Sequence, residues 1–132
     1  MQKFTIGDSK LESEYGISIG RWSRYPGTGS LPFGAMWCQV PAGSQSVQDN
    51  HPEVELAIVV GGEATFTVDG VATAAPAGTA MLLQPGEKHV ISAGEQTVDI
   101  LSIYWLPGSE PEAVRATLSA AEPLGTEAPD GA

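Results

Sequence analysis

The 132-residue sequence has little positive charge, since six lysines and arginines stand against sixteen aspartates and glutamates, a formal net charge of −10 at pH 7. It has no Lys/Arg cluster that could neutralise phosphates, so nucleic acids and anionic membranes are poor candidates as partners. No run reaches the roughly 18 apolar residues of a membrane helix, and the N-terminus lacks the apolar core of a signal peptide. We therefore expect a cytoplasmic protein.

Cysteine and histidine are also scarce. The single cysteine, Cys38, has no partner in the chain for a disulfide, and no base is identifiable near it in the sequence. We interpret Cys38 as a small buried hydrophobe and not as a nucleophile. The two histidines, His51 and His89, each stand beside a turn at the edge of an apolar stretch.

Short strand-like runs separated by turn residues fill the middle of the chain. Asp69-Gly70 is the strongest hairpin signal, because both central residues of a type I′ turn need positive φ. Many short strands at this spacing predict an all-β, antiparallel barrel of jelly-roll type. The expected strands cover residues 33–40, 54–60, 64–68, 71–74, 79–83, 88–92 and 97–105.

The two ends of the chain follow other patterns. Ser109 begins a capping-box pattern, and Val114, Thr117, Leu118 and Ala121 then share one face of a short helix expected to pack on the barrel. Residues 1–121 are thus expected to form one domain, and the acidic, proline-containing residues 122–132 a disordered tail. Residues 20–32 are expected to form a loop over one barrel mouth or a linker from an N-terminal strand.

Four polar residues, Asp49, His51, Glu53 and Glu55, precede the apolar run 56–60 directly. Charges beside a core strand are costly unless something pairs with them, and a bound cation is one such partner. Two spacings stand out here. Gly43-x5-Asp49-x-His51-x3-Glu55-x6-Gly62 is followed by Gly78-x5-Gln84-x-Gly86-x2-His89.

These spacings resemble the two motifs of the cupin superfamily, G-x5-H-x-H-x3-E-x6-G and G-x5-P-x-G-x2-H-x3-N, over a motif core of residues 43–93. The chain departs from them at Asp49, Gln84 and Ala93, which replace the first histidine, the proline and the asparagine. The resemblance implies a small barrel that holds one divalent metal ion. Carried over by position, His51, Glu55 and His89 are the expected ligands, and Asp49 occupies the place of the missing histidine.

The role of Asp49 stays open between a fourth ligand and a group that accepts a proton from bound water. Strand alternation alone would place Glu53 and Glu55 on the same face, so Glu53 competes with Glu55 as a ligand. Pro52 interrupts regular strand pairing, so this alternation is unreliable across it. The motif spacing favours Glu55. Imidazole and carboxylate donors suit zinc or iron(II). The alternative to metal binding is a cupin that has lost its metal.

Other residues are weaker candidates. One pair of the strand 33–40, either Met36 and Cys38 or Trp37 and Gln39, should line the pocket. Tyr104 and Trp105 are expected to pack in the barrel core. The arginines Arg21 and Arg24 could hold an anionic substrate, but a solvated loop is the favoured interpretation.

These observations favour a metalloenzyme that acts on a small molecule by non-redox tailoring chemistry (cyclase, isomerase, lyase or condensation) in specialised metabolism. The alternatives are an iron(II) dioxygenase and a non-catalytic small-ligand-binding protein. The resemblance to small cupins implies a homodimer, formed either by packing barrel faces or through the strand-like residues 15–20 at a sheet edge.

Overall fold

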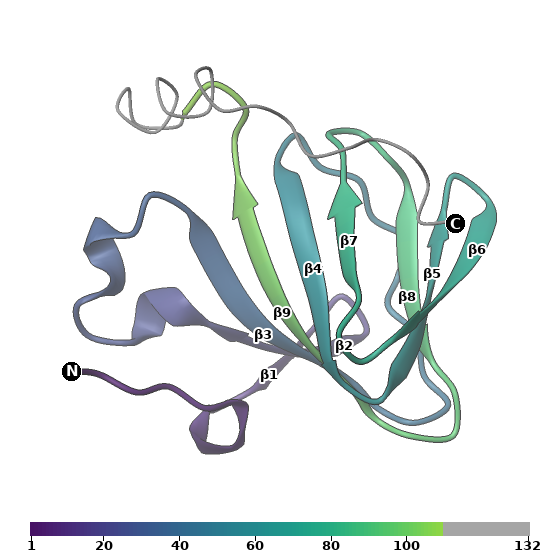
Figure 1. Ribbon diagram of the computed structural model, residues 1–132, viewed down its shortest axis with the longest axis horizontal. Coiled ribbons are helices and arrows are strands. Elements are labelled where there is room, and N and C mark those ends of the chain that lie inside the picture. Colours follow the sequence, from purple (N-terminus) through teal and green to yellow (C-terminus); the bar gives the residue numbers. More distant parts are fainter. Residues whose placement is uncertain (110–132) are drawn as a thin grey trace.

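The computed structural model describes residues 1–109. These residues form nine strands, with three short 3-10 turns as their only helices (Figure 1). No helix among them is long and apolar enough to cross a membrane. The strands are β1 (Glu12–Glu14), β2 (Ile17–Arg21), β3 (Gly34–Val40), β4 (Val54–Gly61), β5 (Glu63–Val68), β6 (Val71–Pro76), β7 (Ala80–Leu83), β8 (His89–Ala93) and β9 (Val98–Trp105).

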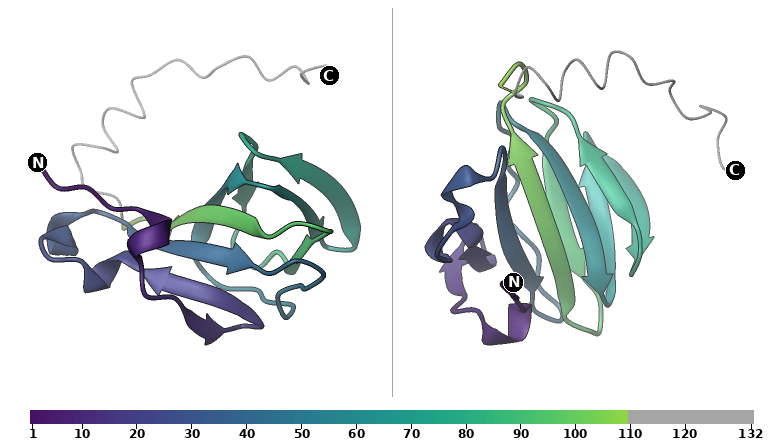
Figure 2. Two further views of the ribbon diagram at one scale, coloured as in Figure 1. Left: turned by 90° about the horizontal axis from the view of Figure 1, so that it is seen from below. Right: turned by 60° about the vertical axis from the view of Figure 1, so that its left-hand side comes forward.

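The strands pair into two antiparallel sheets that enclose one interior (Figure 2). The larger sheet has the order β1-β2-β3-β9-β4-β7, and the smaller sheet has the order β6-β5-β8. This arrangement confirms the predicted all-β antiparallel architecture. Each of the seven strands predicted between residues 33 and 105 is present, with ends within two residues of the prediction.

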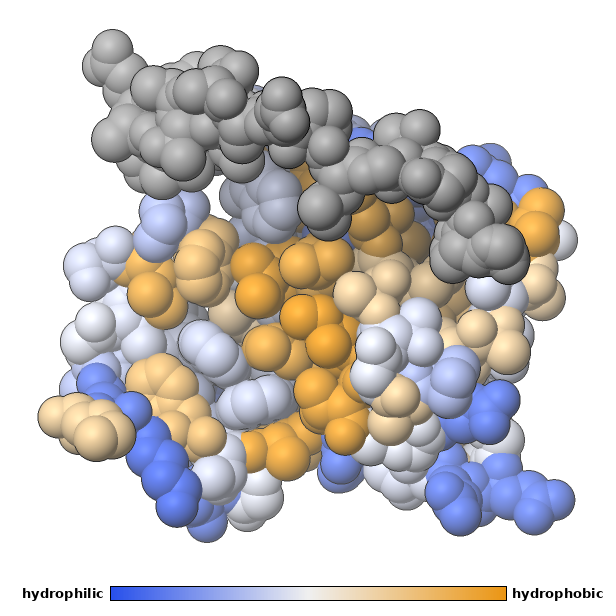
Figure 3. Space-filling view, in the orientation of Figure 1, coloured by the Kyte–Doolittle hydropathy of each residue, from blue (hydrophilic) through white to orange (hydrophobic). Residues whose placement is uncertain are grey.

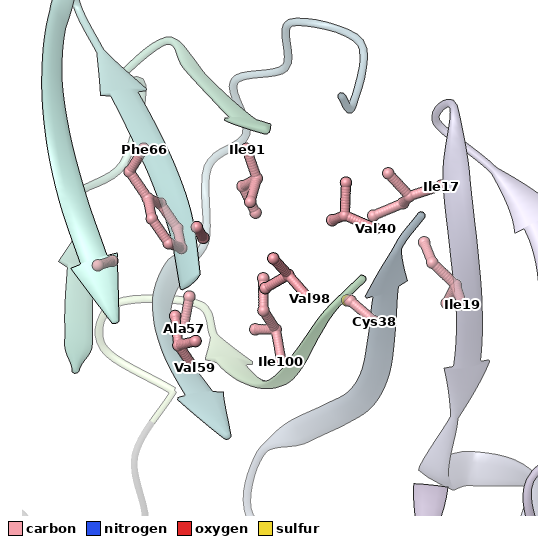
Figure 4. Packing of buried hydrophobic residues seen from close by; sticks show 12 residues of the cluster. Ile17, Ile19, Cys38, Val40, Ala57, Val59, Phe66, Ile91, Val98 and Ile100 are labelled. Carbon is pink, nitrogen blue, oxygen red and sulfur yellow. The ribbon is translucent and has the colours of Figure 1, made fainter. Parts of the chain in front are cut away.

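Alternation along the strands fills the interior with apolar side chains, since successive residues of a strand point to opposite faces. On β9, Val98, Ile100 and Ser102 are fully buried, and the residues between them face the other side of the sheet. Their neighbours in the core come from both sheets (Figure 4). The buried cluster comprises Ile17, Ile19, Cys38, Val40, Ala57, Val59, Ala64, Phe66, Ala75, Ile91, Val98 and Ile100.

Two turns show why the sequence places glycine where it does. At the predicted hairpin, Asp69 has φ 48° and Gly70 has φ 84°, so both central residues have the expected left-handed conformation. After β4, Gly62 has φ 74°, and a Cβ there would overlap the carbonyl oxygen of Thr97. Only glycine fits this position without strain or a backbone shift.

The N-terminal strands β1 and β2 extend the larger sheet, because β2 pairs with β3 of the same chain. Residues 22–33 then connect β2 to β3, as in the linker alternative, and include 3-10 turns at Trp22–Arg24 and Thr28–Ser30. The Trp22 ring packs 5.3 Å from that of Trp37, which lies on the outer side of β3. This connection therefore covers the outer face of β3.

The predicted C-terminal helix through Val114 and Leu118, the domain boundary at residue 121 and the tail 122–132 all lie outside the described residues.

Candidate metal centre

The interior opens into a cavity of about 400 Å³ whose lining is divided between apolar and polar side chains. Met36 and Cys38 line it, so this pair of β3 faces the pocket, while Trp37 and Gln39 face outward. The apolar lining consists of Ile17, Ile19, Met36, Cys38, Val47 and Ile91. The polar lining consists of Tyr15, Arg21, Ser46, Asp49, His51, Glu53, Glu55, His89 and Tyr104.

The backbone fixes Asp49 directly beside His89, the first residue of β8. The Asp49 amide donates to the His89 carbonyl oxygen at 3.1 Å, and the His89 amide donates back to the Asp49 carbonyl oxygen at 2.9 Å. Ser46 is held to Ile91 in the same way, since its amide donates to the Ile91 carbonyl at 2.8 Å and its hydroxyl accepts from the Ile91 amide at 2.9 Å. The segment before Pro52 thus runs along β8 and carries Asp49 into the cavity.

Glu55 lies on β4 and points into the cavity, on the same face of the strand as the buried Ala57 and Val59. Only 6% of the residue is exposed. Its Oε2 accepts a hydrogen bond of 2.6 Å from the Ser102 hydroxyl, and its Oε1 lies 2.9 Å from His51 Nε2. A buried carboxylate is costly without such partners, so these contacts define its orientation.

The four predicted site residues meet in this cavity. One donor atom each of Asp49, His51 and His89 lies within 4.8 Å of the other two. Glu55 adjoins this group, because its Oε1 is 2.9 Å from His51 Nε2 and 3.9 Å from His89 Nε2. The two imidazole rings stand edge to face with centroids 5.0 Å apart. Residues 49–55 and residue 89, well separated in sequence, therefore form one cluster.

Both histidines present the same nitrogen to this cluster. His51 Nδ1 donates to the carbonyl oxygen of Glu53 at 3.1 Å, and His89 Nδ1 donates to that of Glu87 at 3.1 Å. A carbonyl oxygen only accepts, so Nδ1 carries the proton in both rings and each Nε2 is left with a lone pair when the imidazole is neutral. Such a backbone partner is what orients a metal-binding histidine.

The contact between His51 and Glu55 tests whether a cation fits. With Nδ1–H already donating, Nε2 and the carboxylate Oε1 are both acceptors, so their 2.9 Å approach needs one additional proton or another positive charge between them. A divalent cation supplies that charge. Two imidazole nitrogens with carboxylate oxygens are also a donor set that suits zinc or iron(II), so the residues present fit a metal ion.

Glu53 takes part in the site through its backbone. Its carbonyl oxygen orients His51, while its side chain, 35% exposed, lies 3.6 Å from His51 Nδ1 on the side of the ring away from Glu55. Glu53 therefore lies at the protonated Nδ1 of His51, whereas Glu55 lies at Nε2, the nitrogen with the free lone pair.

Two residues of β9 were not recognised as part of the site. Ser102 orients Glu55, and its inward parity with Val98 and Ile100 is the signal that could have revealed it. Tyr104 was expected in the core, but it lines the cavity, because Gly34 opposite it leaves space for the ring. Trp105, on the opposite face of β9, is not a core residue either.

The predicted roles of Arg21, Arg24 and Cys38 can also be compared with the structure. Arg21 lines the cavity from the end of β2 and forms a two-pronged ion pair with Glu14, whereas exposed Arg24 pairs with Glu12. Cys38 is 3% exposed, which confirms a buried hydrophobe. Burial, reinforced by the charge of Glu55, raises the pKa of its thiol to about 12.

Comparison with known proteins agrees with this architecture. A Cupin domain family model matches residues 36–104, a little over half of the chain, and the chain belongs to this family. A Cupin 2 conserved barrel domain protein from Salinispora arenicola is similar in structure, with 24% identity, a TM-score of 0.73 and coverage of 89% of this chain and 98% of that one.

Two further solved structures are similar. A protein of Photorhabdus luminescens is 21% identical with a TM-score of 0.72, covering 89% of this chain and 97% of that one. A predicted oxalate decarboxylase from Thermotoga maritima is 17% identical with a TM-score of 0.68, covering 80% of this chain and 99% of that one. At these identities the likeness shows the fold alone.

Proposed function

We propose that this cupin is a metal-dependent enzyme acting on a small molecule, with Asp49, His51, Glu55 and His89 holding one divalent ion, zinc or iron(II). The observation that carries the proposal is the convergence of two imidazole Nε2 atoms and the Glu55 carboxylate inside a cavity that also has an apolar part of its lining. Such cavities with a few convergent polar groups are the usual form of small-molecule sites.

A divalent ion bound here would polarise a carbonyl group or activate water, which suits a non-redox cyclisation, isomerisation, lyase or condensation reaction. The protein's own residues supply the rest. Ile17, Ile19 and Ile91 contact the apolar part of a substrate and exclude water. Burial raises the pKa of the Tyr104 hydroxyl, against a smaller lowering effect of Arg21. Tyr104 therefore keeps its proton at neutral pH and can donate a hydrogen bond to a substrate oxygen.

An iron(II) dioxygenase is the second candidate, because two histidines with carboxylates are also the donors of non-haem iron sites that keep positions open. The two activities differ in their consumption of dioxygen, which can be measured. An oxygenase consumes dioxygen in proportion to product, whereas the non-redox enzyme turns over at the same rate without oxygen. A protein that only binds its ligand would do neither.

Asp49→Asn tests the proposed site, because the amide keeps the size of the side chain and removes its charge. As a ligand, Asp49 contributes directly to affinity, so we expect weaker metal binding in a chelator competition assay. If Asp49 instead accepts a proton from substrate or water, the variant keeps the metal and loses roughly 10²- to 10⁴-fold in turnover. We favour the ligand role.

The measurement combines metal content, chelator competition and screening of small carbonyl compounds for metal-dependent conversion on one preparation. Glu53→Gln is the matched control, since it removes a nearby carboxylate on the other side of His51. An Asp49→Asn protein equal to wild type in both affinity and turnover would remove Asp49 from the site.

A further inference from the structure

Arg21 stands apart from the other charged side chains of the cavity. Among the described residues that line the cavity it is the only lysine or arginine, and it ends β2, whereas the carboxylates and histidines belong to residues 49–55 and 89. Ile17 and Ile19 point from β2 into the interior (Figure 4), and alternation directs Arg21 to the same side. Arg21 is thus part of a strand and of the cavity lining, and not of the solvated loop that the sequence favoured.

A distance suited to a small molecule separates Arg21 from the candidate metal position. One inward row across the larger sheet, on the neighbouring strands β2, β3, β9 and β4, consists of Arg21, Met36, Ser102 and Ala57. Three strand spacings of about 4.8 Å place the backbones at the two ends of this row roughly 14 Å apart along the sheet. Ala57 is two residues from Glu55 on β4. A molecule in the cavity of about 400 Å³ can therefore reach from the guanidinium toward the metal position.

Tyr104 of β9 brings a second hydrogen-bond donor toward Arg21. The outer surface of β9, β4 and β7 is largely hydrophobic (Figure 3), but β9 has the polar residues Ser102 and Tyr104 at inward positions. A Cβ at Gly34 would overlap the Tyr104 ring at Cε2 and Cζ, so the ring extends over β3, on the side of β9 that faces β2. Burial raises the pKa of the Tyr104 hydroxyl, and Arg21 lowers it by a smaller amount. The hydroxyl therefore lies within electrostatic reach of the guanidinium.

Glu14 fixes the guanidinium of Arg21 without closing it to a ligand. Its Oε1 accepts a hydrogen bond from Arg21 Nη2 at 3.0 Å, and its Oε2 accepts one from Nη1. Glu14 lies on β1 and is not among the described residues that line the cavity, so it holds the guanidinium from outside. An arginine has five N–H groups, and three of them remain for other partners. A guanidinium that is already oriented loses less conformational entropy when a ligand binds.

We propose that Arg21 and Tyr104 form a carboxylate-binding subsite, so that the substrate is a small carboxylic acid with an apolar body. The planar edge of a guanidinium matches the two oxygens of a carboxylate. One cation and one neutral hydroxyl balance a single negative charge, whereas a phosphate dianion would find no second lysine or arginine among the described residues of the lining. Ile17, Ile19 and Met36 contact the apolar body. That the other end of the substrate meets the metal rests on the proposed function, but the subsite itself does not depend on the ion.

NMR titration of the full chain with acetate, hexanoate and 3-phenylpropionate, each compared with its neutral primary amide, tests the subsite. Metal-free protein is titrated first, because a bound ion also attracts carboxylates. Wild-type protein should bind the two larger carboxylates at least about 10-fold more tightly than their amides. Arg21→Met, which keeps an apolar side chain and removes the donors, should lose this preference. Tyr104→Phe should weaken carboxylate binding roughly 3- to 10-fold.

Arg24→Met is the matched control, since exposed Arg24 pairs with Glu12 and does not line the cavity, and it should keep the wild-type preference. Glu14→Gln should keep the preference too, because it breaks the ion pair and leaves the guanidinium in place. Equal losses in Glu14→Gln and Arg21→Met would mean that the ion pair only supports the fold, which overturns the inference. Circular dichroism shows whether each variant is folded.

Wild-type protein that binds none of the carboxylates up to about 10 mM overturns the inference. So does a folded Arg21→Met protein with the wild-type preference. If Arg21→Met does not fold, Tyr104→Phe decides, because it removes a single hydroxyl, and wild-type carboxylate affinity in it overturns the inference. The same titrations with zinc separate the two proposals. A preference that appears only with zinc and survives in Arg21→Met belongs to the ion and excludes the subsite, whereas an Arg21-dependent preference in a chain that binds no zinc supports the subsite and refutes the proposed function alone.

Discussion

Both carboxylate oxygens of Glu55 have partners inside the barrel. Oε1 faces the two histidine Nε2 atoms, and Oε2 accepts from Ser102, a fully buried hydroxyl on β9. This second contact holds the carboxylate so that Oε1 is directed at the two histidines. A hydrogen bond of this kind raises metal affinity without touching the ion, because the ligand is already oriented before the ion arrives.

Ser102→Ala should therefore weaken metal binding by roughly 10- to 100-fold. It should also lower the free energy of unfolding of the metal-free protein by about 1–3 kcal/mol, because a buried acceptor loses its donor. Chelator competition and urea denaturation measure the two effects. Ser92→Ala is the control, since its hydroxyl also donates one hydrogen bond, to Thr65, away from Glu55. Equal metal affinity in the two variants would contradict the positioning role.

Cys38 predicts a dependence of stability on pH. Its folded pKa, about 12, exceeds the unfolded value near 9. Between these values the unfolded thiol has lost its proton and the folded thiol has kept it, so unfolding releases a proton and stability falls as pH rises. The thiol should contribute a slope approaching about 1.4 kcal/mol per pH unit. Urea denaturation from pH 8 to 11 measures it, and a Cys38→Ala protein with the wild-type slope would refute this assignment.

At the scale of elements, most of the fold could be predicted from local patterns. The strands β3 to β9 follow from apolar runs and the turns between them, because alternation and turn chemistry depend on residues close in sequence. The connection between β2 and β3 could not be predicted in this way. It is held by the stacking of Phe4 on Tyr25 and by the tilted packing of Trp22 against Trp37, contacts between separate segments.

The site could be predicted in part for the same reason. The motif spacing named Asp49, His51, Glu55 and His89, and the structure brings them together, although the ligand role of each stays a prediction. Spacing carries no information on which strands become neighbours. Ser102 and Tyr104 join the site because β9 lies between β3 and β4, so their roles depend on sheet order.

At the scale of the whole molecule, β4 joins the candidate site to the core. Its inward face carries Glu55 toward the two histidines and continues with the fully buried Ala57 and Val59. Binding of a metal ion should stabilise the native state by mass action, since the assembled site is not available to the unfolded chain.

We propose that the cavity holds one divalent ion between His51, His89 and the two carboxylates. Zinc titration of metal-free protein, followed by calorimetry and thermal unfolding, measures this binding. Wild-type protein and the Glu53→Gln control should each bind one ion per chain and gain about 2.7 kcal/mol of stability when free zinc is 100 times the Kd. His51→Ala should stay folded, lose at least about 100-fold in affinity and show no such gain at the same zinc concentration. A His51→Ala protein that binds one ion per chain with wild-type affinity would rule out the proposed metal site.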